Sequence, residues 1–279
     1  MSIAADAFDF VCALVHRESA LVLGAGKEYL VESRLLPLAR AQGDPDVETF
    51  VNRARRQPGG PAQREIVEAL TTNETSWFRD SEPFVGLRDL VVPELVAARS
   101  LTRRLRVWSA ACSSGQEPYS IAMVLGDAPQ LAGWSIDVLG TDLSLEMVER
   151  CREGRYSQLE VNRGLPATSL VKHFERDGAA WRVNQSLAAR TTFRQLNLAR
   201  PLVGLGTFDV VFLRNVLIYF DLATKADVLR RVRKILAPDG YLFLGAPETT
   251  MGIDDMWQRQ ALGRGSVYRL MPQAARGVA

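Results

Sequence analysis

Apolar side chains recur with two different periods along this chain. Up to about residue 69 they lie three and four positions apart, as at Phe8, Val11, Cys12 and Val15, which is the period of an amphipathic helix. From residue 105 onward, short apolar runs alternate with helical stretches, and these runs predict strands at 105–111, 136–140, 192–196, 208–213 and 241–245. Short apolar strands separated by helices predict a parallel sheet that is covered on both faces.

Two segments depart from this alternation. Residues 156–187 predict a small inserted antiparallel β subdomain, whose hairpin turns at Asp177-Gly178. Strands at 260–263 and 267–270, joined by Arg264-Gly265, predict an antiparallel hairpin at one end of the main sheet.

The fold class that follows is α/β, with three parts. We expect a small N-terminal helical domain (1–70), a linker (71–90) and a domain with a doubly wound, mostly parallel sheet (91–279). In the last of these, a helix at 221–236 ends at the stop signal Pro238-Asp-Gly240.

The composition is that of a folded globular protein. The 279 residues carry a formal net charge of +2 with acids and bases well mixed, which argues against a generalised nucleic-acid coat. The three cysteines are widely spaced and include no C-x-x-C pair, so we expect reduced thiols and no metal site. No apolar run has the length of a membrane span, and the first residues lack the features of a signal peptide. We therefore expect a soluble, cytoplasmic protein.

The loop after the predicted strand at 105–111 is the most informative stretch of the chain. It consists of small residues up to Gly115, and Pro118 stands where the first turn of a helix would begin. Small residues let a ligand approach the backbone, and the helix start offers free N–H groups. Glu117 would repel a pyrophosphate, and the full G-x-G-x-x-G of a dinucleotide site is missing. The loop suits a cofactor with positive charge, such as S-adenosylmethionine. Taken alone, it is equally compatible with an ordinary strand–turn–helix in which Glu117 is solvated.

Asp142 ends the next predicted strand, and a helix-start signal follows at Ser144. An acidic residue at this distance after a nucleotide-binding loop commonly bonds ribose hydroxyls. Taken alone, Asp142 would more commonly be an N-cap or a turn residue. Paired with the Gly115 loop, it is better interpreted as a ribose ligand.

Residues 71–80 join the helical region to the α/β region. They combine small hydrogen-bonding side chains, two aromatic residues and Arg79, a mixture that is typical of a ligand wall between domains. The structural alternative is a capping box at a helix start, formed by Thr71 and Glu74.

Polar residues also follow two later strands. The buried strand at 208–213 ends in Arg214 and Asn215, with Tyr219 a turn later, and Asn197 follows the strand at 192–196. Ligands of open α/β sheets bind at such carboxyl ends, so we expect these side chains to face a ligand.

Five separate, correctly ordered stretches resemble the chemotaxis receptor methyltransferases, the CheR family. They are 71–80, 106–121, 140–144, 197–198 and 214–221. The resemblance runs from about residue 71 to residue 270, with a fainter match over the N-terminal helices. Members of this family transfer the methyl group of S-adenosylmethionine to receptor glutamate side chains. The resemblance implies this activity, S-adenosylhomocysteine as the product, and a Rossmann-like methyltransferase domain.

Site residues follow from the resemblance and from the Gly115 loop. The cofactor-binding candidates are Asn73, Thr75, Arg79, Gly115, Glu117, Asp142, Asn197, Leu198, Arg214 and Asn215. Arg79 suits the methionyl carboxylate, Glu117 the α-ammonium or the sulfonium, and Asp142 both ribose hydroxyls. Asn197 and Leu198 suit adenine.

Tyr219 and Arg214 are the candidate catalytic residues, which would position the incoming glutamate carboxylate. A buried core tyrosine is the alternative interpretation of Tyr219. A glutamate with a pKa of about 4.3 is already ionised at neutral pH, so no general base is required. The two histidines, His16 and His173, lie outside every candidate site, which agrees with a reaction that depends on alignment.

The resemblance also implies a partner, the glutamate-rich cytoplasmic helices of methyl-accepting chemoreceptors, met by the helical domain. Lys27 and Arg34 lie seven residues apart and so share a helical face, and they are the first candidate contacts. Arg53 and Arg56 are further candidates, and a solvated basic face is the alternative.

Some members of the family additionally bind a pentapeptide at the receptor's C-terminus through the β subdomain, using a longer, glycine-containing hairpin loop. The corresponding turn here, at 175–181, is abrupt, and Trp181 is expected to pack into the subdomain core. We therefore expect the pentapeptide-independent subtype.

Two other function classes remain as alternatives. One is a non-catalytic regulatory module that binds S-adenosylmethionine or S-adenosylhomocysteine. The other is a nucleic-acid methyltransferase, which is disfavoured because the chain has no Asn/Asp-Pro-Pro-Tyr motif and the helical domain is not net basic. The sequence leaves open which receptor and which glutamates are modified, the behaviour that results, and the oligomeric state.

Overall fold

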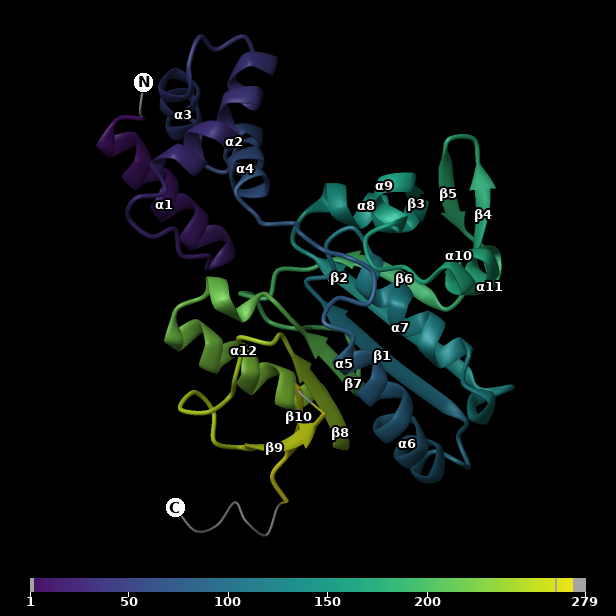
Figure 1. Cartoon of the computed structure of the whole chain (residues 1–279). Helices are drawn as coiled ribbons and strands as arrows, with labels where there is room; N and C mark the ends of the chain where they lie inside the picture. Colours follow the sequence, from purple (N-terminus) through teal and green to yellow (C-terminus); the bar gives the residue numbers. More distant parts are fainter. Residues whose placement is uncertain (1–2, 264, 273–279) are drawn as a thin grey trace. The chain divides into compact units, whose positions relative to one another are not determined.

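The computed structural model describes residues 3–263 and 265–272, and the chain forms two compact units (Figure 1). One unit holds the chain up to Thr72 together with Tyr219–Lys225. The other holds Asn73–Ile218 and the chain from Ala226 onward. None of the helices within the described ranges is both long and apolar enough to cross a lipid bilayer.

The first unit is helical, as predicted. It contains α1 (Ala5–Ser19), α2 (Glu28–Ala41), α3 (Val47–Arg55) and α4 (Pro61–Ala69). Asp46 caps α3 by accepting a hydrogen bond from the Thr49 amide at 2.7 Å, and Pro61 occupies the first turn of α4, where its missing N–H costs nothing. Val11 and Phe50 are fully buried, so the apolar stripes of the helices face a common core.

The second unit is built on a mixed sheet with the strand order β6-β2-β1-β7-β8-β10-β9. The strands are β1 (Arg104–Ala110), β2 (Ser135–Asp142), β6 (Thr191–Gln195), β7 (Phe208–Leu213), β8 (Leu236–Leu244), β9 (Trp257–Leu262) and β10 (Gly265–Leu270). Neighbours from β6 to β8 run parallel, whereas β10 pairs antiparallel with β8 and β9. The doubly wound sheet and its closing hairpin are confirmed; Arg264, predicted for the hairpin turn, lies outside the described residues.

Helices connect the strands and cover the sheet. They are α5 (Glu82–Gly86), the π-helix η1 (Leu87–Val91), α6 (Val92–Ala98), α7 (Gln116–Gly126), the 3₁₀-helix η2 (Pro129–Leu131), α8 (Leu145–Glu153), the 3₁₀-helix η3 (Leu217–Tyr219) and α12 (Leu222–Ile235). Every residue of β7 is buried, because this strand lies inside the sheet and is covered on both faces. A strand in this position has both faces buried, which explains why β7 is a continuous run of mostly apolar residues.

β8 begins at Leu236, earlier than the predicted strand at 241–245. Pro238-Asp-Gly240, predicted as a stop signal between helix and strand, lies within β8. The register with β7 passes from Phe208 opposite Leu236 to Val210 opposite Tyr241, so the turn residues form a bulge and pairing resumes beyond them.

The predicted inserted subdomain forms a second sheet with the order β3-β5-β4. Its elements are β3 (Arg155–Ser157), α9 (Gln158–Val161), α10 (Ala167–His173), β4 (Phe174–Asp177), β5 (Ala180–Val183) and α11 (Gln185–Ala188). The hairpin of β4 and β5 turns at Gly178 and stands out from its unit in Figure 1. The rings of Tyr156 and Phe174 pack edge-on against Trp77, with centroids 4.9 and 5.3 Å away.

Candidate functional site

The loop after β1 has a strained backbone. The φ angle is +59° at Ala111, +49° at Ser113 and +96° at Gly115. Left-handed positions cost a non-glycine residue about 1–3 kcal/mol each and cluster at functional sites. A Cβ atom at Gly115 would lie 2.9 Å from the Tyr156 hydroxyl oxygen, so the close approach requires glycine. The surrounding structure therefore holds this loop in one shape.

Asp142 joins this loop to the end of β2. Its Oδ2 accepts a hydrogen bond from the Ser113 amide at 2.7 Å, and its Oδ1 accepts one from the Ser144 amide at 3.0 Å. The Leu196 amide donates to the Asp142 carbonyl oxygen at 2.8 Å, which brings the segment after β6 alongside. A carboxylate offers about four lone-pair directions to hydrogen-bond donors.

Beneath the loop lies a layer of buried hydroxyl and thiol groups. The Tyr156 hydroxyl donates to the Ser114 carbonyl oxygen at 2.8 Å, and the Cys151 thiol donates to the Ser113 carbonyl oxygen at 3.1 Å. Burial raises the pKa of Tyr156, and the contact with Cys151, followed by burial, raises the pKa of Cys112. The Tyr156 and Cys112 side chains therefore stay protonated at neutral pH and support the loop without acting as nucleophiles.

A buried arginine lies at the end of β7. Arg214 Nη1 donates to Glu117 Oε2 at 2.8 Å, and Nη2 donates to both the Arg79 carbonyl oxygen and Asp80 Oδ2 at 2.8 Å. The other oxygen of Glu117 accepts a hydrogen bond from the Ser109 hydroxyl at 2.8 Å. The Arg214 side chain is 1% exposed and that of Glu117 is 13% exposed. Among the described residues, Arg214 Nε is buried without a hydrogen-bond partner.

The linker does not contain the capping box that was the structural alternative for Thr71 and Glu74. Residues 71–80 form no helix, and the next helix, α5, begins at Glu82. Thr71 instead donates its hydroxyl proton to the Glu68 carbonyl oxygen at 2.7 Å, at the end of α4. The capping-box alternative is therefore wrong, because the chain remains irregular where the box needs a first helical turn.

The backbone of the linker contacts the loop that follows β1. The Ser113 hydroxyl donates to the Asn73 carbonyl oxygen at 2.7 Å. Arg79 Nη1 donates to the Glu74 carbonyl oxygen at 3.0 Å, and φ is +48° at Phe78. The half-buried linker thus contacts the segments that follow β1 and β7.

Comparison with known proteins assigns the chain to a family. The CheR methyltransferase all-alpha domain matches residues 6–71, and the CheR methyltransferase SAM-binding domain matches residues 73–263. The chain belongs to the CheR methyltransferase family. It is an S-adenosylmethionine-dependent methyltransferase, as predicted, and S-adenosylmethionine is its cofactor.

Several named relatives match along most of their length. Chemotaxis protein methyltransferase 1 of Pseudomonas aeruginosa is 41% identical over 96% of this chain and 99% of its own. Chemotaxis protein methyltransferase Cher2 of Pseudomonas putida is 41% identical over 91% of this chain and 94% of its own. Chemotaxis protein methyltransferase 1 of Vibrio cholerae is 39% identical over 93% and 94%, respectively.

The candidate cofactor residues come from the linker and from the ends of neighbouring strands. They are Asn73, Thr75 and Arg79 in the linker, Gly115 and Glu117 at the start of α7, Asp142 at the end of β2, Asn197 and Leu198 after β6, and Arg214 and Asn215 after β7. Because β6, β2, β1 and β7 are adjacent and parallel, their carboxyl ends share one edge of the sheet (Figure 1). The side-chain oxygen of Asn197 accepts the Ala199 amide at 2.8 Å, and Leu198 is buried.

Tyr219 belongs to the first compact unit, whereas the candidate cofactor residues belong to the second. Its carbonyl oxygen accepts a hydrogen bond from the Val22 amide at 2.9 Å, and the next residue, Phe220, forms an isolated antiparallel bridge with Leu21. Its side chain is half-buried.

One acidic residue at the same edge of the sheet, where the parallel strands have their carboxyl ends, was missed in the sequence analysis. Glu248 follows β8, is 8% exposed, and accepts hydrogen bonds from four backbone amides. It also lines a cavity of about 540 Å³ together with Asp80 and Arg214. The rule that singled out Asp142, an acid just beyond a strand end, would have found Glu248 had it been applied to β8.

Proposed function

We propose that the protein transfers the methyl group of S-adenosylmethionine to glutamate side chains of chemoreceptor cytoplasmic helices, giving glutamate methyl esters. The observation that carries this proposal is the similarity, across both family domains, to proteins named chemotaxis protein methyltransferase. We propose that residues 1–70 face the receptor, that residues 71–90 form a linker contributing to the cofactor site, and that residues 91–279 form the methyltransferase domain.

The residues present fit the cofactor. Asp142 is an ionisable acceptor at a strand end, suited to the ribose hydroxyls, and Glu117 is suited to the α-ammonium. Arg79 is the proposed partner of the methionyl carboxylate, and Asn197 and Leu198 are proposed to hold adenine. The glycine required at 115 lets the cofactor lie against the backbone. When bound, the cofactor supplies an electrophilic methyl carbon on a positively charged sulfur.

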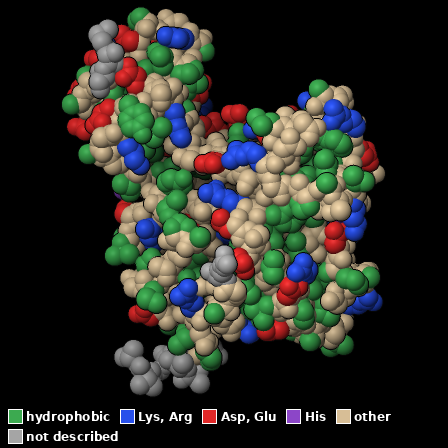
Figure 2. Space-filling model, viewed as in Figure 1, with side chains coloured by type: hydrophobic (Ala, Val, Ile, Leu, Met, Phe, Trp, Pro, Cys, Tyr) green, Lys and Arg blue, Asp and Glu red, His purple; other side chains and the backbone are tan. Residues whose placement is uncertain are grey.

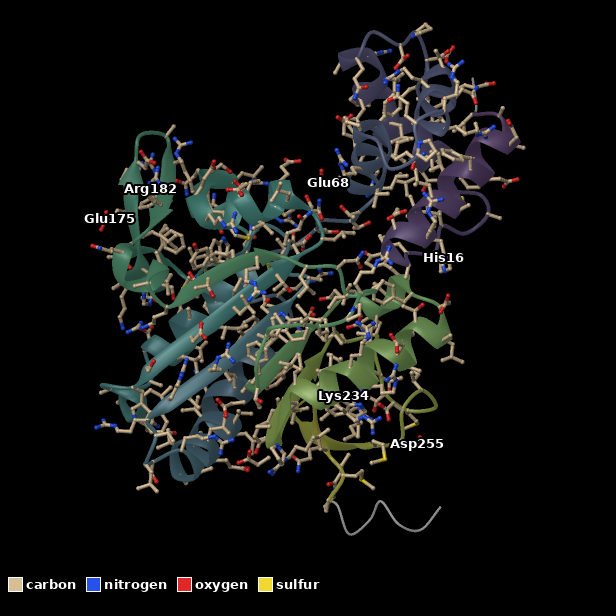
Figure 3. All side chains as sticks on the ribbon, turned by 180° about the vertical axis from the view of Figure 1, so that it is seen from behind. His16, Glu68, Glu175, Arg182, Lys234 and Asp255 are labelled. Atoms are coloured by element: carbon tan, nitrogen blue, oxygen red, sulfur yellow. The ribbon has the colours of Figure 1, made fainter. Side chains whose placement is uncertain are left out.

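The chain itself contributes binding and orientation. The acceptor carboxylate is ionised at neutral pH, so the protein needs no proton acceptor. The two histidines fit this view, since His16 (Figure 3) lies 3.2 Å from Asp221 and His173 lies 3.1 Å from Asp127, all outside the proposed cofactor residues. We propose that alignment supplies most of the rate enhancement.

Arg214 was a candidate for direct contact with the acceptor, and its bonds support a different role. Both terminal nitrogens are engaged by Glu117, Asp80 and the Arg79 carbonyl, and the side chain is nearly inaccessible. We propose that Arg214 orients Glu117 and the linker, and that Tyr219 positions the incoming carboxylate.

Two of the four basic residues proposed as receptor contacts, Arg34 and Arg53, are already bonded within the helical unit. Arg34 donates to the Thr71 carbonyl oxygen at 2.6 Å, and Arg53 is paired with Asp44 at 2.6 Å. Lys27 and Arg56 are exposed. We therefore propose Lys27 and Arg56 as the main electrostatic contacts with glutamate-rich receptor helices.

We also propose that the protein is of the pentapeptide-independent subtype. Strand pairing ends at Asp177 opposite Ala180, so the β4–β5 turn is short. Trp181 is half-buried, its Nε1 donates to Gln158 Oε1 at 2.9 Å, and the Arg176 guanidinium lies 4.8 Å from its ring centroid. These internal bonds support a structural role for Trp181.

A methyl-transfer assay tests the proposed function. Radiolabelled S-adenosylmethionine is incubated with the protein and, separately, a receptor cytoplasmic fragment, the same fragment with glutamine at its methylation sites, and duplex DNA. We expect base-labile label on the first fragment only. Label on DNA would favour the nucleic-acid alternative, and cofactor binding without label on any substrate would favour the regulatory module. On the face that Figure 2 shows, acidic and basic side chains are interspersed, and no continuous basic surface of the kind that binds nucleic acid is seen there.

A further inference from the structure

Glu248 binds the backbone of two loops that follow adjacent strands. Its Oε2 accepts the Gly245 amide at 2.7 Å and the Asn215 amide at 2.8 Å. Its Oε1 accepts the Val216 amide at 2.9 Å and the Ile218 amide at 3.3 Å. A single carboxylate thus ties the end of β8 to the turn that carries Asn215.

This turn has a conformation that needs such support. Asn215 has a φ of +58°, a left-handed position that is costly outside glycine. A left-handed turn directs successive amides toward one side, and a carboxylate facing them satisfies donors that burial would otherwise leave unpaired. Glu248 therefore stabilises the turn in this conformation.

A side chain at Gly245 would collide with Glu248 and Asn215. A Cβ atom at Gly245 would lie 2.7 Å from Glu248 Oε2 and 2.8 Å from both the backbone and the side-chain nitrogen of Asn215. Contacts below 3.0 Å force a movement, and here the neighbours are a backbone amide and a bonded carboxylate. The position of the Asn215 side chain thus depends on Glu248 and on the missing Cβ atom at Gly245.

We propose that Glu248 is a positioning residue for methyl transfer, which holds residues 215–218 so that Asn215 is presented correctly at the cofactor edge of the sheet. This inference rests on the proposed cofactor role of Asn215, and it assigns Glu248 no contact with either substrate. Replacing a residue that merely stabilises the fold would lower the unfolding temperature but leave cofactor affinity and kcat nearly unchanged.

The test compares two buried carboxylates of the same unit. Glu248→Gln replaces one acceptor oxygen by an NH₂ group that faces amide donors. The matched control is Asp209→Asn: Asp209 is 9% exposed and accepts the Arg106 amide at 2.8 Å, but it lies near the start of β7, away from the cofactor edge. Affinity for S-adenosylhomocysteine is measured by calorimetry, alongside thermal unfolding and receptor methylation at saturating cofactor.

We expect Glu248→Gln to weaken S-adenosylhomocysteine binding about tenfold or more and to lower kcat. Asp209→Asn should lower the unfolding temperature but leave affinity and kcat within about twofold. Gly245→Ala should reproduce the binding loss, and it provides the test if Glu248→Gln fails to fold. Equal affinities in wild type and in the folded Glu248 or Gly245 variant would overturn the proposal. The binding measurement does not depend on which substrate is methylated, so a failure of the proposed function would be seen separately.

Discussion

Arg214 and Glu117 form a buried ion pair with 2.8 Å between Nη1 and Oε2, although 97 positions separate them in the sequence. The pair joins the end of β7 to the first turn of α7, and the bonds from Arg214 to Asp80 and to the Arg79 carbonyl oxygen extend it into the linker. One guanidinium therefore connects three segments at the cofactor edge. Removing one member of such a pair is costly, because the other charge is left buried without compensation.

Arg214→Met should destabilise the protein by about 3–5 kcal/mol in denaturant unfolding, since Glu117 and Asp80 lose their common partner. Cofactor affinity should fall with it, because Glu117 loses its orientation. The control is Arg230→Met, which removes an exposed pair with Asp227 and should change the unfolding free energy by less than about 0.5 kcal/mol. Similar stability losses in the two variants would contradict a special role for Arg214.

Asp142→Ala should weaken S-adenosylhomocysteine binding by about 1.5–3 kcal/mol, through lost hydrogen bonds between the carboxylate and the ribose. Asp142→Ala also removes the hydrogen bond from the Ser113 amide, which holds the loop. A cofactor analogue that lacks the 2′-hydroxyl separates the two effects by a double-mutant cycle. Wild type should discriminate against the analogue and Asp142→Ala should not; equal discrimination by both would remove the ribose assignment.

Tyr219→Phe should lower kcat for receptor methylation about tenfold or more and leave the calorimetric affinity for S-adenosylhomocysteine unchanged. The reason is that the lost hydroxyl is proposed to bond the acceptor carboxylate and not the cofactor. Tyr29→Phe, at an exposed tyrosine of α2, is the control. A kcat within twofold of wild type would leave Tyr219 a structural residue.

Lys27→Glu and Arg56→Glu should slow receptor methylation at low salt, with the difference from wild type shrinking as salt screens the charges. Cofactor affinity should not change. Arg34→Glu should instead destabilise the helical unit, because Arg34 bonds the carbonyl oxygens of Ala69 and Thr71 at the end of α4. Wild-type methylation rates for the Lys27 and Arg56 variants at every salt concentration would show that the basic surface is merely solvated.

Hydrogen bonding by Arg99 lowers the pKa of Asp239 below its ordinary value, with Arg99 Nη1 and Asp239 Oδ2 2.8 Å apart. A lowered folded-state pKa contributes stability above the unfolded pKa and loses it as pH falls toward the folded pKa. The stability gap between wild type and Asp239→Asn should therefore be largest near pH 7 and shrink below about pH 4. Thermal unfolding across this range checks it, with Asp255→Asn, at an exposed aspartate (Figure 3), as the control. A gap that stays constant with pH would contradict the assignment.

Local patterns were sufficient for most of the secondary structure and for placing several polar residues at strand ends. Apolar period, small residues at turns and acids beyond strand ends depend on a few neighbouring positions, so the parallel strands, the Gly115 loop and Asp142 were predictable. The start of β8 was not. A turn signal such as Pro238-Asp-Gly240 favours the same local backbone in a loop and in a bulge, and pairing with β7 decides between them.

Only the tertiary structure decided which polar groups bond to one another. The chemistry of Arg214 allowed contact with a substrate, but its position between Glu117 and Asp80 commits it to internal bonds. The place of Glu248 just beyond a strand is visible in the sequence, but its four amide partners are not, because three come from a turn some thirty positions earlier and one from its own loop. Strand order brings these segments together, and that order is set by packing of the whole sheet. The sequence alone thus determined the kind of cofactor site, and long-range packing determined which residues hold it in shape.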